Sequence, residues 1–256
     1  MSTMKDSVPI GLGLMGRRLP APFGLWLIDV PEALDPRLPA CLSDEENARA
    51  NRFRDEFLAR RYRAAHGALR LLADSLFAIP TGQQHYAANA HGKPGLRDFP
   101  RMHCSLSYGG RRFLVGWSLD RAIGVDLEPM RTLPDARDLA ELHFTPAERT
   151  RLSQVKDLHR AFLTAWVRKE ACVKALGSGL TIAPASFECD LDPGSVLVEI
   201  EGSSIESHVY DLKDDDLVAW ARCTPPNRSD RIHRHVAACP LSIRASTAEV
   251  AAVLRG

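Results

Sequence analysis

The sequence predicts an α+β fold made of two similar halves, each a small antiparallel sheet packed on a long helix. Three observations support this prediction. The order of elements runs twice, as a strand, a long helix and then further strands. The two helical stretches share a spacing of alanine, arginine and leucine. The chain has 256 residues, 45% of them hydrophobic, which is enough for a core in each half. We therefore expect a division into residues 1–105 and 106–245.

The first half is expected to begin with a Gly/Pro-rich leader and a strand at residues 24–30. Ser43 has the character of a helix N-cap, because acidic residues follow it directly. The pattern predicts one long helix from there to Leu76, ended by a proline and a glycine. Residues 11–16 of the leader spell G-x-G-x-x-G. That motif binds dinucleotides only between a strand and a helix, and neither is predicted here, so we interpret the segment as a flexible leader.

The second half is expected to open with a short strand and turn at residues 102–110 and then a β-hairpin that turns at Leu119 and Asp120. The two strands of that hairpin are predicted at residues 112–118 and 121–128, and further strands at residues 196–200, 217–222 and 235–238. Thr145 is a predicted N-cap, and a proline in the first helical position follows it. A helix is expected from about residue 156 to 176, closed by two glycines.

Charge and composition exclude several classes of protein. The 33 lysines and arginines nearly balance 32 aspartates and glutamates, so a net charge of +1 gives no general attraction to nucleic acid or membrane. No apolar run approaches the ~18 residues of a membrane span, and the N-terminus lacks the pattern of a secretory signal. The six cysteines are scattered, without zinc-ligand spacing. We expect reduced thiols and a cytoplasmic protein.

Two carboxylates fall on one face of the strand predicted at residues 121–128. A side-chain period of two puts Asp126 and Glu128 on the same side, about 7 Å apart at Cα. Two carboxylates at that separation repel each other unless a positive charge lies between them, and Mg²⁺ is suited to such a pair. The alternative is the solvated outer face of a hairpin, and this segment taken alone favours that alternative over a metal site.

The second long helix carries charged residues at two kinds of position. Glu170 falls at the edge of its apolar stripe, and Lys174 lies one turn further on the same flank. Such a pair is also common as a surface ion pair. Lys169 projects from the middle of the apolar stripe, where an ammonium needs a partner. We therefore predict that Lys169 meets a carboxylate or several carbonyl groups in the interior.

These segments together resemble the Sfp-type 4'-phosphopantetheinyl transferases. Residues 166–180 match the signature W-x-x-K-E-A-x-x-K-A-x-G-x-G-L, and residues 124–128 match G-x-D-x-E. Residues 144–148 are similar to the F-[ST]-x-x-E segment of the family, and residues 92–94 to its G-K-P turn. The resemblance covers most of the chain, from about residue 43 to 240. It implies an enzyme that moves phosphopantetheine from coenzyme A to a serine of an apo carrier protein and releases 3',5'-ADP.

The resemblance also implies roles for particular residues. Asp126, Glu128 and Glu170 would be ligands of Mg²⁺, with Mn²⁺ also suited to these oxygen ligands. Glu170 is then the candidate general base for the serine proton, and Lys174 the candidate contact to the phosphates. The adenosine 3'-phosphate is expected among cations of the first half. The candidate coenzyme A ligands are Lys93, Arg49 and Arg61 from that half, together with Ser107 and Tyr108. Either arginine taken alone is better explained as a solvated helix residue than as a ligand.

Tyr108 is a departure from the family, which usually has histidine after the serine of this segment. A tyrosine hydroxyl can donate a hydrogen bond to a phosphate but cannot supply positive charge. Either coenzyme A binds more weakly, or an arginine such as Arg111 or Arg112 compensates.

Two alternatives to the transferase remain open from sequence. One is a non-catalytic relative that binds coenzyme A or a carrier protein, and the other is a Mg²⁺-dependent phosphohydrolase. By analogy with shorter relatives, a monomer is expected, with the active site in the cleft between its two halves. The partners expected are coenzyme A and an apo carrier protein, with no nucleic acid or membrane. The pathway that the carrier serves, whether fatty-acid, polyketide or nonribosomal-peptide synthesis, does not follow from the sequence.

Overall fold

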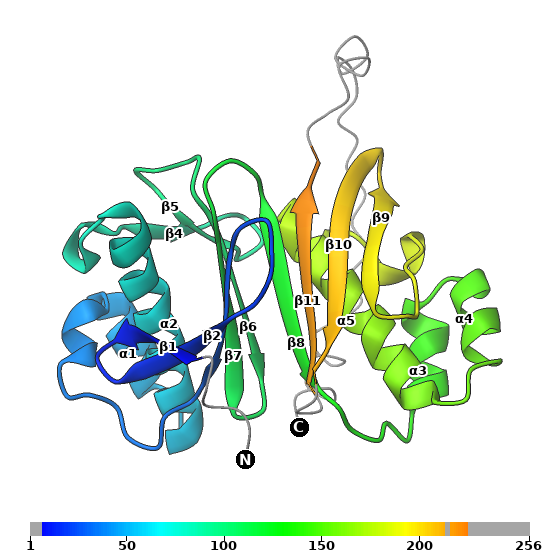
Figure 1. Cartoon of the computed structure of the whole chain (residues 1–256), viewed down its shortest axis with the longest axis horizontal. Helices are drawn as coiled ribbons and strands as arrows, with labels where there is room; N and C mark the ends of the chain where they lie inside the picture. Colours follow the sequence, from blue (N-terminus) through cyan, green and yellow to red (C-terminus); the bar gives the residue numbers. More distant parts are fainter. Residues whose placement is uncertain (1–6, 213–215, 225–256) are drawn as a thin grey trace, which may run out of the picture.

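The computed structural model describes residues 7–212 and 216–224 and arranges them as two α+β halves side by side (Figure 1). The first sheet has the strand order β1-β2-β3-β7-β6-β5-β4, and the second has the order β8-β11-β10-β9. The strands of the first sheet are β1 (Ser7–Gly11), β2 (Leu14–Arg18), β3 (Gly24–Asp29), β4 (Tyr86–Ala88), β5 (Pro94–Leu96), β6 (His103–Gly109) and β7 (Arg112–Ser118). Those of the second are β8 (Ile123–Pro129), β9 (Gly194–Ile200), β10 (Ser203–Asp211) and β11 (Asp216–Cys223).

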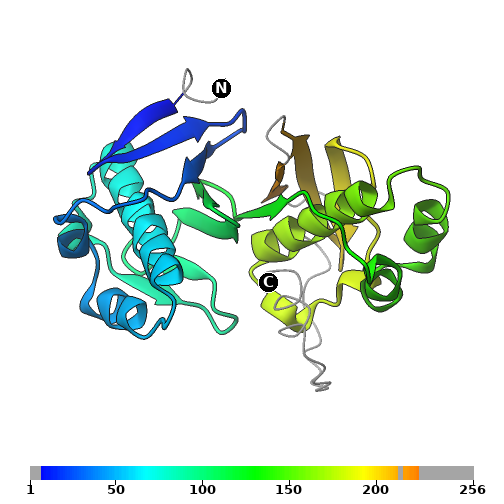
Figure 2. The same cartoon turned by 90° about the horizontal axis from the view of Figure 1, so that it is seen from below.

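Helices cover one side of each sheet, and the views in Figures 1 and 2 agree on which half each helix joins. The α-helices of the described residues are α1 (Asp44–Asn51), α2 (Glu56–Phe77), α3 (Ala136–His143), α4 (Pro146–Leu152) and α5 (Leu158–Leu176). Short 3₁₀ turns occur at η1 (Leu38–Cys41), η2 (Thr81–Gln83), η3 (Gly179–Thr181) and η4 (Pro184–Ser186). In this part of the chain, no helix combines the length and apolar character that crossing a membrane requires.

The two halves repeat one topology, which confirms the predicted fold class. In each half, a first strand is followed by helices and then by antiparallel strands. The last strand of the half returns to pair with the first, so that β3-β7-β6-β5 corresponds to β8-β11-β10-β9. The β1–β2 hairpin is an addition at the free edge of β3.

Local sequence sets the ends of the helices. Ser43 and Thr145 each form a capping box with the glutamate three residues later, as their positions predicted. The expected single helix from Ser43 to Leu76 is wrong. Asp55 begins a second helix, because its carboxylate accepts hydrogen bonds from the backbone N–H groups of Phe57 (2.7 Å) and Leu58 (3.2 Å).

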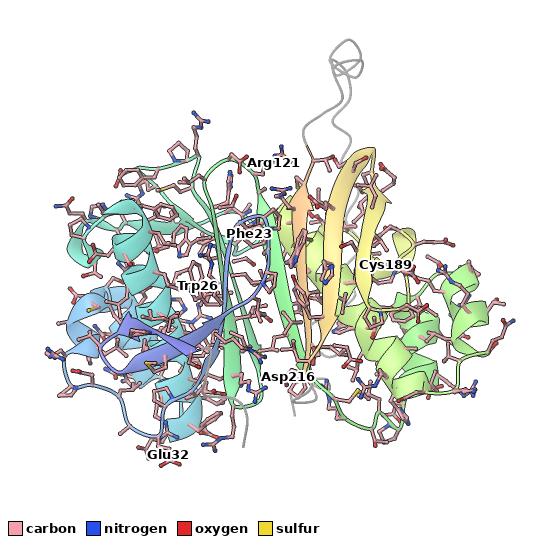
Figure 3. The ribbon with its side chains drawn as sticks, in the orientation of Figure 1. Phe23, Trp26, Glu32, Arg121, Cys189 and Asp216 are labelled. Atoms are coloured by element: carbon pink, nitrogen blue, oxygen red, sulfur yellow. The ribbon has the colours of Figure 1, made fainter. Side chains whose placement is uncertain are left out.

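A shared apolar cluster joins the two halves. The inner faces of the sheets and the β2–β3 connection contribute Leu19, Phe23, Leu25, Leu27, Leu114, Ile123, Val125, Leu127, Val218 and Trp220. Phe23 meets Trp220 edge to face at 5.7 Å and lies between the sheets in Figure 3. Arg112 adds a polar link, since its guanidinium donates to Asp29 (2.9 Å) in the first sheet and to Asp216 (2.5 Å) in the second.

Three further sequence expectations differ from the structure. Residues 7–18 form a hairpin and not a flexible leader, because apolar side chains such as Leu14 complete the first core. Strands β7 and β8 follow each other but do not pair, since β3 and β6 already occupy both edges of β7. The expected division at 105/106 falls within β6, and the change of sheet comes after β7. Sequence reasoning also missed β4, β5, α3 and β10, while the strand predicted at 235–238 lies outside the described residues.

Candidate active site

A close contact between β8 and α5 builds the site. Gly124 makes this contact possible, because a Cβ atom there would lie 2.0 Å from the Ala171 carbonyl oxygen and 2.4 Å from the Ala175 nitrogen. The alternation along β8 then points Asp126 and Glu128 to the side of α5, while Val125 enters the apolar seam. The glycine of the G-x-D-x-E segment thus brings the strand carboxylates up to the helix.

Asp126 lies at the centre of a three-residue polar cluster. Its Oδ1 atom accepts a hydrogen bond from Ser107 Oγ at 2.7 Å and forms an ion pair with Lys174 Nζ at 2.5 Å. The Lys174 ammonium also donates to Ser107 Oγ at 3.3 Å. Asp126 is 4% exposed, so these contacts are screened little by water. The three residues come from β8, β6 and α5, and the cluster therefore lies at the seam between the halves.

Glu128 lies beside this cluster, and the negative charge of its carboxylate is only partly neutralised. Its carboxylate pairs with Arg131 at 2.9 Å. Burial and the nearby charge of Asp126 raise the pKa of Glu128 to about 7, although Arg131 and Lys174 oppose the shift. Lys174 and Arg131 therefore neutralise the negative charges of Asp126 and Glu128 only in part.

The carboxylates have the chemistry of a Mg²⁺ site, but they do not form a closed ligand set. Asp126 Oδ2 is buried without a hydrogen-bond partner, which is the state of an oxygen that a hard cation would use. Glu170 is half-buried on α5, one turn before Lys174. Among residues 7–212 and 216–224, no three His, Cys, Asp or Glu side chains gather closely enough to hold a metal ion. In this arrangement, Lys174 and Arg131 supply the positive charge.

Lys169, the neighbour of Glu170, points into the interior as predicted. Its ammonium is fully buried and forms an ion pair with Glu148 at 2.9 Å. It also donates to the carbonyl oxygens of Pro184 (2.7 Å) and Phe187 (2.6 Å). Lys169 therefore fixes α5 to α4 and to the loop that follows the helix.

The first half contains a cavity of about 860 Å³ between α1, α2, β4 and β6. Five arginines and two glutamates are among its lining residues, so its charge suits an anion. The basic residues that line it are Arg49, Arg52, Arg61, Arg70, Arg97, His66 and His85. The predicted ligands Arg49 and Arg61 both lie there, together with Tyr108.

Tyr108 and Ser107 are neighbours on β6, but their side chains serve different sites. Ser107 faces Asp126, whereas Tyr108 lines the cavity, where the Arg61 guanidinium lies 5.3 Å from its ring centre. Arg61 also donates to the Gly110 carbonyl at 3.0 Å. The cation beside Tyr108 is thus Arg61, while the expected candidate Arg112 pairs with carboxylates at the seam.

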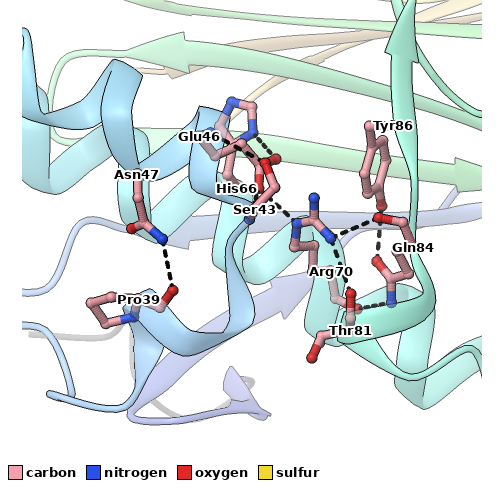
Figure 4. Close-up of polar contacts among 9 residues, drawn as sticks. All are labelled: Pro39, Ser43, Glu46, Asn47, His66, Arg70, Thr81, Gln84 and Tyr86. Atoms are coloured by element: carbon pink, nitrogen blue, oxygen red, sulfur yellow. Dashed lines mark hydrogen bonds and ion pairs between the residues drawn. The ribbon is translucent and has the colours of Figure 1, made fainter.

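A buried network that sequence reasoning missed supports the cavity wall (Figure 4). Glu46 accepts from Arg70 Nε at 2.8 Å and contacts His66 Nδ1 at 2.9 Å. Arg70 also donates to the carbonyl oxygens of Thr81 and Gln84. The signal available in sequence was the capping glutamate of α1 opposite His66 and Arg70, which lie four residues apart on α2.

The Lys93 ammonium has partners that the sequence did not predict. Its ammonium donates to the carbonyl oxygens of Ile123 (2.9 Å) and Ala175 (3.2 Å), both in the second half. Burial lowers its pKa, and only its neighbours Gly92 and Pro94 line the large cavity. The structure therefore does not bring the Lys93 ammonium together with Arg49 and Arg61.

The chain is similar in sequence to known 4'-phosphopantetheinyl transferases. The model of the 4'-phosphopantetheinyl transferase superfamily matches residues 122–223. The 4'-phosphopantetheinyl transferase HetI of Nostoc sp. is 36% identical over 163 residues, which cover 61% of this chain and 69% of HetI. The 4'-phosphopantetheinyl transferase Sfp of Bacillus subtilis is 25% identical over 190 residues, covering 73% and 84%. A solved holo-[acyl-carrier-protein] synthase of Thermotoga maritima matches 40% of this chain and 62% of its own, at 22% identity and a TM-score of 0.29.

The chain belongs to the 4'-phosphopantetheinyl transferase superfamily and is of its Sfp-like type. It is accordingly a transferase that moves the 4'-phosphopantetheine group from coenzyme A to a carrier protein.

Proposed function

We propose that the transfer takes place at the seam, with Asp126, Glu128 and Glu170 holding Mg²⁺ or Mn²⁺ next to the coenzyme A diphosphate. The observation that carries this proposal is the Asp126 cluster. One carboxylate oxygen is bound by Ser107 and Lys174, while the other is buried and has no partner. A bound divalent ion would neutralise charge on the diphosphate during attack at phosphorus.

Glu170 and Lys174 are the proposed catalytic residues. The serine oxygen of the carrier forms the new bond to the phosphorus that bears pantetheine, and the bond to the leaving 3',5'-ADP breaks. Glu170 accepts the serine proton, directly or through one water molecule. The Lys174 ammonium offsets charge on the leaving group, and its contacts with Asp126 and Ser107 hold it at the seam.

The cavity of the first half is the proposed site for the adenosine 3'-phosphate. Its four arginines other than Arg70, which is paired with Glu46, can neutralise a phosphate, and Arg61 is held in place by the Tyr108 ring and the Gly110 carbonyl. Because Ser107 and Tyr108 are adjacent on β6, one strand would carry both the diphosphate contact and the nucleotide contact.

We also propose a monomer in the cytoplasm. Both halves of the site come from one chain, and the five cysteines of the described part carry free thiols, which suits a reducing compartment.

One assay tests the proposed residues. The protein is incubated with coenzyme A, Mg²⁺ and an apo carrier protein, and the carrier is weighed by mass spectrometry. We expect a phosphopantetheine adduct whose rate of formation falls by at least about 10²-fold in Glu170→Gln. The matched control Glu199→Gln, on the exposed edge strand β9, should keep the wild-type rate. Equal rates in the two variants would refute the role of Glu170.

Two added measurements, of coenzyme A binding and of phosphate release, distinguish the two alternatives to the transferase. Coenzyme A binding without an adduct would identify a non-catalytic relative. Release of phosphate without carrier would identify a phosphohydrolase.

A further inference from the structure

The turn between β4 and β5 joins the nucleotide cavity to the helix of the catalytic cluster. Asn89 Nδ2 donates to the Gly177 carbonyl at 2.8 Å. The Lys93 ammonium donates to Ala175 and Ile123, at 3.2 and 2.9 Å. We call this contact the latch, formed by Asn89, His91 and Lys93 against Ala175, Gly177, Gly179 and Ile123.

The two glycines after α5, Gly177 and Gly179, suit the latch because they lack a side chain. Both have positive φ, +70° at Gly177 and +57° at Gly179. A Cβ atom at Gly179 would lie 2.7 Å from His91 Cβ, and one at Gly177 would lie 3.3 Å from Lys93 Cδ. A helix end alone would need one such glycine. The second is required by the close approach of the β4–β5 turn.

Hydrogen bonds within the β4–β5 turn fix its conformation. Asn89 Oδ1 accepts hydrogen bonds from the backbone N–H groups of His91 (2.9 Å) and Lys93 (3.0 Å). The same turn contributes Gly92 and Pro94 to the wall of the large cavity. In this turn, the side chains of Asn89 and Lys93 therefore bind the second half, while Gly92 and Pro94 line the proposed nucleotide site.

The carbonyls that accept from Lys93 lie next to the catalytic cluster. Ala175 follows Lys174 directly, and Ile123 lies three residues before Asp126 on β8. An ammonium shared between them ties the end of α5 to the start of β8. It also complements the negative end of the α5 dipole.

We propose that Lys93 is a positioning residue, whose ammonium sets the distance between the nucleotide cavity and the catalytic cluster. It does not bind phosphate. This inference rests on the proposed function, because it takes the large cavity as the nucleotide site. A displacement of about 1 Å at a reacting centre can cost about 10²-fold in rate. Loss of Lys93 should therefore lower kcat and leave nucleotide affinity nearly unchanged.

Two measurements on the full chain test the latch. The first is the Kd of 3',5'-ADP by calorimetry without metal, and the second is kcat of transfer to an apo carrier protein. For Lys93→Met we expect a Kd within about 3-fold of wild type and a kcat at least about 10-fold lower. Lys156→Met removes the same charge from an exposed position and should change neither value.

Asn89→Ala is a second probe that leaves the buried ammonium in place, so it remains informative if Lys93→Met does not fold. It should lower kcat in the same direction without weakening 3',5'-ADP binding. An increase in Kd of more than about 10-fold in Lys93→Met would make Lys93 a phosphate ligand and overturn the proposal, as would an unchanged kcat in both variants. Absence of 3',5'-ADP binding in the wild type would refute the nucleotide cavity, while the kcat comparison would still judge the latch.

Discussion

Replacing Lys169 by methionine tests how this protein carries a buried charge beside its catalytic glutamate. The Lys169 and Glu148 side chains are both fully buried, and the ammonium also satisfies two carbonyl groups. Methionine fills a similar volume but leaves the Glu148 carboxylate without a counter-charge. In that variant, the Glu148 carboxylate would keep its hydrogen bonds from the backbone N–H groups of Thr145 (2.8 Å) and Cys189 (2.6 Å).

The expected cost is large for a single substitution. Breaking a buried ion pair by removing one partner typically destabilises a protein by about 3–5 kcal/mol. That is a substantial part of a total stability of about 5–15 kcal/mol. For a chain of this length, we expect Lys169→Met to lower the Tm by roughly 10 °C. The measurement is urea unfolding followed by tryptophan fluorescence, with calorimetry as a second readout.

A second substitution separates the charge from the packing. Glu148→Gln added to Lys169→Met removes the buried carboxylate charge, so the double variant should be more stable than Lys169→Met alone by at least about 1 kcal/mol. Lys156→Met, at an exposed position, should stay within about 0.5 kcal/mol of wild type. A Lys169→Met protein at least as stable as wild type would refute the reasoning.

Three further predictions follow from single contacts. Burial would raise the pKa of Glu46, but hydrogen bonds to His66 and the Ser43 backbone N–H and the charges of Arg70 and His66 lower it from 4.5 to about 2. Glu46 therefore adds about 3 kcal/mol above pH 4.5, and this is lost as the pH falls towards 2, so acid unfolding of Glu46→Gln should be less steep over that range. Gly124→Ala should destabilise the protein by about 1–3 kcal/mol or more and slow transfer, because its Cβ would meet the α5 backbone at 2.0 Å, whereas Gly82→Ala, with open space around it, should be neutral in both unfolding and activity assays. Tyr108→His should bind coenzyme A more tightly below about pH 6.5, where the imidazole is charged, and an unchanged or weaker calorimetric Kd there would count against the proposed nucleotide site.

Local patterns in the sequence were sufficient for the two predicted helix caps, for the carboxylate face of β8 and for the type of chemistry. The caps at Ser43 and Thr145 depend on contacts three residues apart, and the structure confirms both. The period of β8 placed Asp126 and Glu128 on one face, and the apolar stripe of α5 identified Lys169 as a buried ammonium. These inferences succeed because neighbours along a strand or helix determine them.

Tertiary structure decided which of these residues meet. Ser107 lies 19 residues from Asp126 in sequence, and the strand crossing at the seam brings their side chains together. Lys93 is the lysine of the G-K-P turn, yet its ammonium donates to carbonyl oxygens 30 and 82 residues away in the sequence. No periodicity encodes such pairings, because they depend on how the two sheets pack face to face. The sequence by itself determined the groups available for transfer chemistry, and the packing of the two halves determined which groups share a site.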